Sequence, residues 1–144
     1  MAIDVKANVV VDKSPEEVAE VMFNPKRDKL WVRDLTEVYP MESGLYRKGA
    51  RIERVGNFLN KHYAAKLLVT AYKENSFVQL YSDEPFEMNI RYDLTPTDEG
   101  TNIRLRISSI ADIPFNSPVS VVSGKAQEMI ERDLERLKKH LDQN

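Results

Sequence analysis

The most informative stretch of this sequence is residues 117–141, which read SPVSVVSGKAQEMIERDLERLKKHL. Apolar residues recur there every three or four positions, the spacing of an amphipathic helix; they are Val122, Ala126, Met129, Ile130, Leu134, Leu137 and Leu141. Pro118 suits the first turn of such a helix, and the basic residues 138–140 suit its C-terminal end. A helix of about 25 residues is roughly 37 Å long, so it is the only predicted helix long enough to cover a whole sheet.

The middle of the chain predicts the sheet that this helix would cover. Candidate strands lie at about residues 34–42, 50–57, 61–73, 76–83, 86–95 and 101–110, and turn residues such as Ser43-Gly44 and Glu84-Pro85 separate them. Apolar and polar side chains alternate most clearly in residues 86–94 and 103–107, which predicts strands with one face buried and the other in water. Short connections between successive strands favour an antiparallel meander.

The N-terminal segment predicts one more strand and two short helices. Residues 3–11 begin with a clean alternation of apolar and polar side chains, typical of a half-buried strand. Ser14 can then cap a helix, Pro15 suits its first position, and Glu17 stands where a capping-box carboxylate reaches back. Asn24-Pro25 ends that helix, and residues 26–31 can form a further turn.

Four stretches carry a resemblance to a known superfamily: residues 9–18 (VVVDKSPEEV), Trp31, residues 69–74 (VTAYKE) and residues 92–101, from YDLTP to Gly100-Thr101. In these stretches and in the order of its elements, the chain resembles the START-like, or SRPBCC, superfamily of lipid-transport proteins and polyketide cyclases/dehydrases. The resemblance implies an α+β helix-grip fold. In that fold a curved antiparallel sheet of about seven strands wraps around a long C-terminal helix, and two short helices follow strand 1. It implies a cavity under the helix, but no shared catalytic residues.

Composition narrows the class of protein further. The 144 residues suffice for one domain, residues 1–144, and 42% of them are hydrophobic. A formal net charge of −2 argues against a dedicated nucleic-acid binder. Cysteine is absent, which excludes thiol catalysis, disulfides and thiolate metal sites. Charged residues at the N-terminus and the lack of a long apolar run predict a protein without a secretory signal or a transmembrane helix, located in the cytoplasm.

Metal and nucleotide sites are not expected. The two histidines, His62 and His140, fall in no metal-ligand spacing. Ser123-Gly124-Lys125 resembles the end of a P-loop, but Ala126 replaces the required hydroxyl residue and the upstream glycine is missing. We therefore expect no cofactor, and we expect Gly124 to allow close approach of the helix to the sheet or a slight bend.

A cluster of basic residues allows two interpretations; it comprises Arg47, Lys48, Arg51 and Arg54, with Lys26, Arg27 and Lys29 nearby in sequence. The interleaved Glu42 and Glu53 favour a solvated surface. The alternative is a cationic rim beside the cavity mouth that attracts the anionic head group of a ligand.

The candidate cavity residues come from the predicted inward faces of the strands and from the helix stripe. They are Trp31, Tyr63, Met88, Tyr92, Met129 and Asp133. The methionines suit an adaptable wall, and buried tyrosines need a hydrogen-bond partner that a ligand or water can supply. His62 and Tyr63 are the candidates for catalysis, but no partner carboxylate is evident for His62.

These residues favour binding over catalysis. The best-defined inward faces carry no convergent acid and base, whereas binding needs mainly shape, apolar surface and a few polar groups. We therefore expect a small hydrophobic or aromatic ligand, lipid- or polyketide-like, in an internal cavity. The alternatives are a polyketide cyclase/dehydrase-like enzyme and a cochaperone-like interaction module. Nothing in the sequence indicates the oligomeric state.

Overall fold

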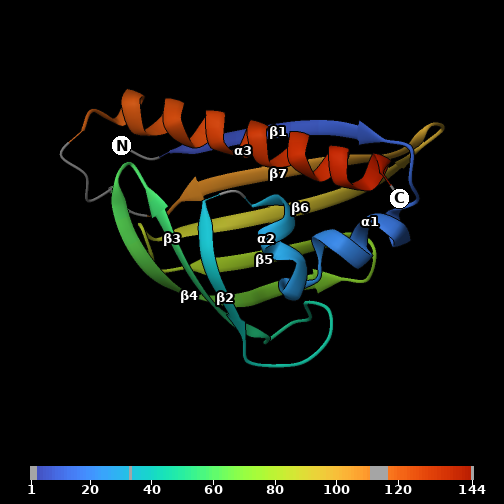
Figure 1. The fold of residues 1–144 in the computed structure, drawn as a ribbon, viewed down its shortest axis with the longest axis horizontal. Helices are drawn as coiled ribbons and strands as arrows, with labels where there is room; N and C mark the ends of the chain where they lie inside the picture. The colour runs from blue at the N-terminus through green and yellow to red at the C-terminus, as the bar shows by residue number, and fades with distance from the viewer. Residues whose placement is uncertain (1–2, 33, 111–116, 144) are drawn as a thin grey trace.

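The computed structural model describes residues 3–32, 34–110 and 117–143, and a seven-stranded antiparallel sheet dominates it. The strands are β1 (Asp4–Val11), β2 (Leu35–Pro40), β3 (Arg51–Phe58), β4 (Lys61–Lys73), β5 (Phe77–Ser82), β6 (Met88–Thr97) and β7 (Gly100–Ser109). Their order is β1-β7-β6-β5-β4-β3-β2, so β2 to β7 form a meander and β1 pairs with the last strand. The sheet is strongly curved (Figure 1).

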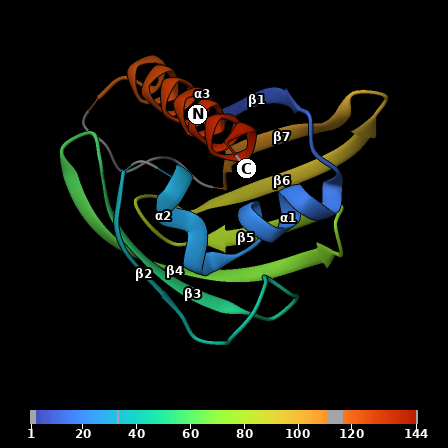
Figure 2. The same cartoon turned by 45° about the vertical axis from the view of Figure 1, so that its right-hand side comes forward.

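Three short helices follow β1: α1 (Pro15–Met22), the 3-10 helix η1 (Pro25–Arg27) and α2 (Asp28–Trp31). The capping box predicted for α1 is confirmed, because the Glu17 amide donates to Ser14 Oγ at 3.2 Å and the Ser14 amide donates to Glu17 Oε1 at 3.1 Å. The backbone break at Asn24-Pro25 then allows the chain to turn. As a result α1 and α2 lie on the concave side of the sheet (Figure 2).

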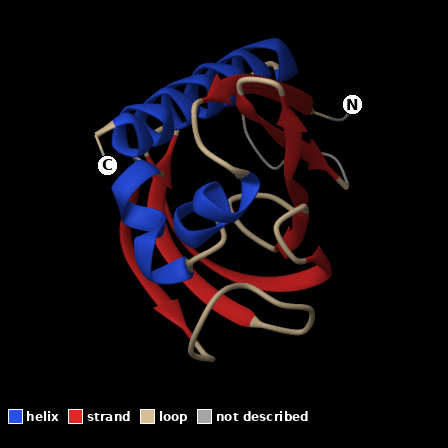
Figure 3. Ribbon diagram, turned by 90° about the vertical axis from the view of Figure 1, so that its right-hand side faces the viewer, coloured by secondary structure: helices blue, strands red, loops and turns tan. Residues whose placement is uncertain are grey.

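The long helix α3 (Val119–Asp142) crosses the concave side of the sheet next to β1 (Figures 1 and 3). It starts one residue after Pro118, which stands at the N-cap. The predicted stripe faces the sheet. Met129 is half-buried, and the other six residues are buried: Val122, Ala126, Ile130, Leu134, Leu137 and Leu141. The helix-grip fold is therefore confirmed, with the sheet wrapped around α3.

The core lies between α3, the short helices and the inward faces of the strands. Alternate residues of β6 and β7 are buried there and face one another in register, as Ile90 does with Ile107 and Tyr92 with Leu105. Side chains of α3 also reach the outer edge of β1, where Gln127 donates to the Lys6 carbonyl at 2.9 Å. None of the described helices combines the length and apolar character needed to cross a membrane.

Gly124 does not bring α3 close to the sheet, which is one of the two roles expected of it. It lies on an exposed part of α3, and a Cβ atom built at this position meets nothing within 4 Å. The expectation of close approach to the sheet is therefore wrong. Because glycine in an exposed helix interior is less favourable than alanine, Gly124→Ala should raise the free energy of unfolding by about 0.5–1 kcal/mol. Urea denaturation of the variant beside the wild type tests this, and a destabilised variant would contradict it.

Candidate functional site

A cavity of about 70 Å³ lies between the concave face of the sheet and α3. Most of its wall is apolar and comes from three parts of the fold: Phe58 of β3, Met88, Ile90, Leu105 and Ile107 of β6 and β7, and Ala126, Met129 and Ile130 of α3. Pro85 and Phe86, in the loop before β6, also line the cavity. The Phe58 and Phe86 rings meet edge to face, with centroids 6.1 Å apart.

The structure places all six candidate cavity residues in this wall: Trp31, Tyr63, Met88, Tyr92, Met129 and Asp133. Their role in ligand binding stays a prediction. His62 lies elsewhere, because it points away from the cavity on β4, is exposed, and has its Nδ1 atom 3.2 Å from Asn57 Oδ1. Of the two candidates for catalysis, only Tyr63 therefore reaches the cavity.

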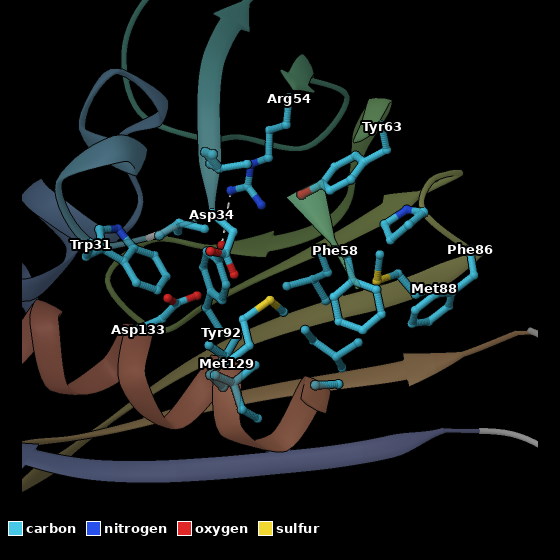
Figure 4. A pocket seen from close by; sticks show the side chains of 18 residues that line it. Trp31, Asp34, Arg54, Phe58, Tyr63, Phe86, Met88, Tyr92, Met129 and Asp133 are labelled. Carbon is cyan, nitrogen blue, oxygen red and sulfur yellow. Dashed lines mark hydrogen bonds between the residues drawn. The ribbon is translucent and has the colours of Figure 1, made fainter. Parts of the chain in front are cut away.

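The cavity has a polar end and an apolar end (Figure 4). Phe58, Phe86 and Met88 gather at the apolar end. Arg54 and Tyr92 bring a guanidinium group and a hydroxyl group to the other end, where the carboxylates of Asp34 and Asp133 also lie. A molecule in the cavity can therefore bury an apolar part and still form hydrogen bonds at one end.

A buried hydrogen-bonded cluster stands behind the polar end; its members are Asp28, Tyr46, Arg54 and Tyr92. The Tyr46 hydroxyl donates to Asp28 Oδ2 at 2.6 Å, and the Arg54 Nε and Nη2 atoms donate to the same oxygen at 3.2 and 2.8 Å. Arg54 Nη2 also lies 3.1 Å from the Tyr46 hydroxyl and 3.2 Å from the Tyr92 hydroxyl. Because Asp28 belongs to α2, the cluster fastens this short helix to β3 and β6.

Burial controls the ionisation of this cluster. It raises the pKa of Asp28 above its ordinary value, although Arg54 and the Tyr46 hydroxyl act in the opposite direction. Burial likewise raises the pKa of Tyr46, Tyr63 and Tyr92. The tyrosines therefore stay protonated at neutral pH, and those that line the cavity can donate hydrogen bonds there. Asp28 Oδ1 is buried and has no hydrogen-bond partner among the described residues.

Gly56 sets the position of the Tyr63 ring. The two residues pair across β3 and β4, and a Cβ atom on Gly56 would lie 2.9 Å from the Tyr63 hydroxyl oxygen. It would also lie 2.5 Å from the backbone oxygen of Asp34. The absence of a side chain at residue 56 therefore lets Tyr63 lie across β3, with its hydroxyl group pointing toward the polar end (Figure 4).

Sequence reasoning missed Asp28, and it named Arg54 only as a member of the basic cluster. The solvated-surface interpretation is wrong for Arg54, which is only 5% exposed, although Arg47, Lys48 and Arg51 are indeed exposed. The signal was present in the alternation of β3, because Arg54 shares its face with the buried Ile52 and Phe58. Of these four residues, Arg54 alone lines the cavity, so the other three do not form the cationic rim of the alternative interpretation.

A second hollow, which we call the outer groove, adjoins the cavity on the outside. It is lined by Asp34, Asn57, Phe58, Leu59, Asn60, Lys125, Met129 and Arg132. Three of these residues, Asp34, Phe58 and Met129, also line the cavity. The outer groove therefore lies where the turn between β3 and β4 faces α3, and only a few side chains separate it from the cavity.

Within residues 3–32, 34–110 and 117–143, no three histidine or acidic side chains are grouped as ligands for a metal ion. The polar groups of the cavity wall are a guanidinium group, two phenol hydroxyl groups, an indole N–H and two carboxylates. Such groups orient a bound molecule and select it by its donors and acceptors.

No family model and no curated protein matches this sequence. Solved structures do match it. A START superfamily protein from Mycobacterium smegmatis superimposes with a TM-score of 0.81 at 15% identity, over 97% of each chain. Ara h 8.0201 superimposes with a TM-score of 0.73 at 10% identity, over 100% of each chain. DynU16, from the dynemicin biosynthetic locus, has a TM-score of 0.71 at 18% identity, over 96% of this chain and 47% of its own.

These neighbours define the class of fold. The chain has the START-like, or SRPBCC, helix-grip fold that its sequence predicted. At identities of 10% to 18% the likeness concerns the fold alone.

Proposed function

We propose that the protein binds a compact hydrophobic or aromatic molecule in the cavity between the sheet and α3. The observation that carries this proposal is the division of the cavity into an apolar end, at Phe58, Phe86 and Met88, and a polar end, at Arg54 and Tyr92. Burying apolar surface supplies the affinity, and the few polar groups supply orientation.

The size of the cavity restricts the ligand. A buried water needs about 10–15 Å³ of such space, so a cavity of about 70 Å³ holds a small group and not a long acyl chain. Met88 and Met129 are the flexible parts of the wall, and their side chains can rearrange around a ring system. We therefore favour a compact, ring-containing ligand over a lipid with an extended tail.

The polar end favours a ligand with an oxygen acceptor. Arg54 is held in place by Asp28, so its guanidinium group cannot swing away from the cavity wall. Figure 4 shows part of this group pointing into the cavity, toward the side where the Tyr63 hydroxyl lies. A carbonyl or hydroxyl oxygen at this place can accept from a guanidinium N–H and from a phenol, both of which are protonated at neutral pH.

One observation favours an enzyme of the cyclase/dehydrase kind as the second candidate. Arg54 and Tyr92 both line the cavity and lie 3.2 Å apart, so two polar groups do converge there. The shape similarity to DynU16, from a biosynthetic locus, is compatible with this candidate. However, burial raises the pKa of Tyr92 and of Tyr63, which keeps both phenols protonated at neutral pH, so they do not accept a proton and are weak proton donors. Binding is therefore the better supported function.

Filling the cavity tests the proposal. Ala126 lies in the wall on α3 and is 1% exposed, so the ring of an Ala126→Phe variant points into the cavity. We expect this variant to bind the neutral dye N-phenylnaphthylamine at least about tenfold more weakly than the wild type, because ring and dye compete for one space. Dye fluorescence during titration measures the dissociation constant.

Ala64→Phe is the matched control, because Ala64 is an exposed residue on the outer face of β4. The control should keep the wild-type affinity for the dye, and circular dichroism of both variants checks that they are folded. Failure of the wild type to bind the dye, or equal binding by the folded Ala126→Phe variant, would contradict the proposed site.

A further inference from the structure

We propose that the outer groove binds the anionic group of an amphipathic ligand, with Lys125 and Arg132 as its cationic partners. The apolar part of the same ligand lies in the cavity, so this inference rests on the proposed function and adds the charge of the ligand to it. A ring system that carries a carboxylate is the class of molecule that fits both parts.

The spacing of three α3 residues carries this inference. Lys125, Met129 and Arg132 stand at positions i, i+4 and i+7, so they follow one another along a single face of the helix. Met129 lines both the cavity and the outer groove. A ligand that leaves the cavity past Met129 therefore emerges between two cationic side chains, which are about 10 Å apart along the helix axis.

Arg132 is only weakly engaged within the protein. Its Nη1 atom lies 4.0 Å from Glu128 Oε1, at the limit of an ion pair, and both side chains are partly exposed. Its Nε atom is buried and has no hydrogen-bond partner within the part of the chain that the structure describes. Because a guanidinium group forms paired hydrogen bonds with a carboxylate, an anion in the outer groove would engage it more fully than Glu128 does.

The opposite side of the outer groove is polar and carries little negative charge. Asn57 and Asn60, beside the turn between β3 and β4, add amide groups that can donate hydrogen bonds. Asp34 is the one carboxylate among the described lining residues, against two cations. Its backbone oxygen accepts from the Asn57 amide at 3.1 Å, which ties the Asp34 backbone to β3. Because both cations stand on α3, the anion is expected beside the helix.

The cations of this proposal stand on α3 and differ from Arg47 and Lys48, which the sequence offered as part of a cationic rim. Those two residues are exposed and line neither the cavity nor the outer groove. Lys125 and Arg132 could not be assigned to a rim from the helical pattern alone, since any outward position of an amphipathic helix carries such residues.

Two dyes of the same skeleton test the inference. Anilinonaphthalene sulfonate carries one negative charge, and N-phenylnaphthylamine lacks it. We expect Lys125→Gln/Arg132→Gln to weaken binding of the sulfonate about tenfold, as two partly exposed charge contacts imply, and to change binding of the neutral dye less than twofold. Added salt should weaken sulfonate binding to the wild type and have little effect on the variant.

Arg136→Gln/Lys139→Gln is the matched control, because it removes two positive charges from the same helix outside the outer groove. The control should bind both dyes as the wild type does. Equal sulfonate affinity in the test and control variants, with the neutral dye still bound, would overturn this inference and leave the proposed function intact. Failure of the wild type to bind the neutral dye would instead overturn the proposed function.

Discussion

Arg54→Met is expected to lower the free energy of unfolding by about 3–5 kcal/mol, because it leaves a buried carboxylate without its cation. Asp28 is 0% exposed, and its Oδ2 atom accepts hydrogen bonds from two nitrogens of Arg54. Once Arg54 is replaced, the Tyr46 hydroxyl is the one remaining donor to that oxygen among the described residues. Urea denaturation followed by circular dichroism measures the loss of stability.

Two further variants separate the buried pair from a general effect of charge. Arg51→Met changes the same residue type on the same strand, but the Arg51 side chain is 70% exposed, so a loss below about 1 kcal/mol is expected. The double variant Asp28→Asn/Arg54→Met removes both charges and should recover part of the loss. If Arg54→Met and Arg51→Met lower the free energy of unfolding by the same amount, the buried cluster does not stabilise the fold in this way.

The loss caused by Arg54→Met should depend on pH. Burial already raises the pKa of Asp28 in the folded wild type, and removal of the nearby cation raises it further. A folded-state pKa above the unfolded value means that the carboxyl group costs stability as pH rises and the group ionises. The difference in free energy of unfolding between variant and wild type should therefore be small in acid. It should grow as pH rises from the folded-state pKa of Asp28 in the wild type to the higher pKa of Asp28 in the variant. A difference that does not change with pH would contradict this explanation.

The fold could be predicted because its elements obey local periods. The alternation in residues 86–94 and 103–107 assigned one buried face to each strand, and the three-and-four spacing of residues 122–141 assigned the buried stripe of α3. The same two patterns placed Met88, Tyr92 and Met129 in the wall of the cavity.

The buried cluster was missed because two sequence signals at Arg54, its residue type and its position in the strand, predict different locations. Its charge and its basic neighbours indicated the surface, whereas its place between Ile52 and Phe58 indicated the core. The position was the better guide, because a partner could neutralise the charge. That partner, Asp28, lies 26 residues away on a one-turn helix, and no local period connects a short helix with a strand.

The outer groove was beyond sequence reasoning for a different reason. Its two sides come from α3 and from the turn between β3 and β4, and their separation depends on how far the sheet curves. Leu59 and Asn60 both have positive φ angles, 50° and 62°, which produce a tight turn beside the helix. Sequence patterns predict that such a turn exists, but not which helix residues it faces.

Trp31→Ala is expected to lower the free energy of unfolding by about 3–5 kcal/mol, the usual cost of removing a large buried aromatic side chain. Trp31 is 0% exposed and meets the Tyr92 ring edge to face, with centroids 5.5 Å apart. It also lines the cavity, so its removal enlarges the space in which the proposed ligand lies. Urea denaturation measures the loss of stability.

The enlarged cavity gives this variant a second, opposite effect. N-phenylnaphthylamine should stabilise Trp31→Ala more than it stabilises the wild type, because a ligand that binds only the folded state adds stability as its affinity rises. Trp31→Phe is the control: it keeps an aromatic ring against Tyr92 and removes an indole N–H that has no partner among the described residues. Trp31→Phe should lower the free energy of unfolding by less, about 1–2 kcal/mol. If the dye stabilises all three proteins equally, it does not occupy the space beside Trp31.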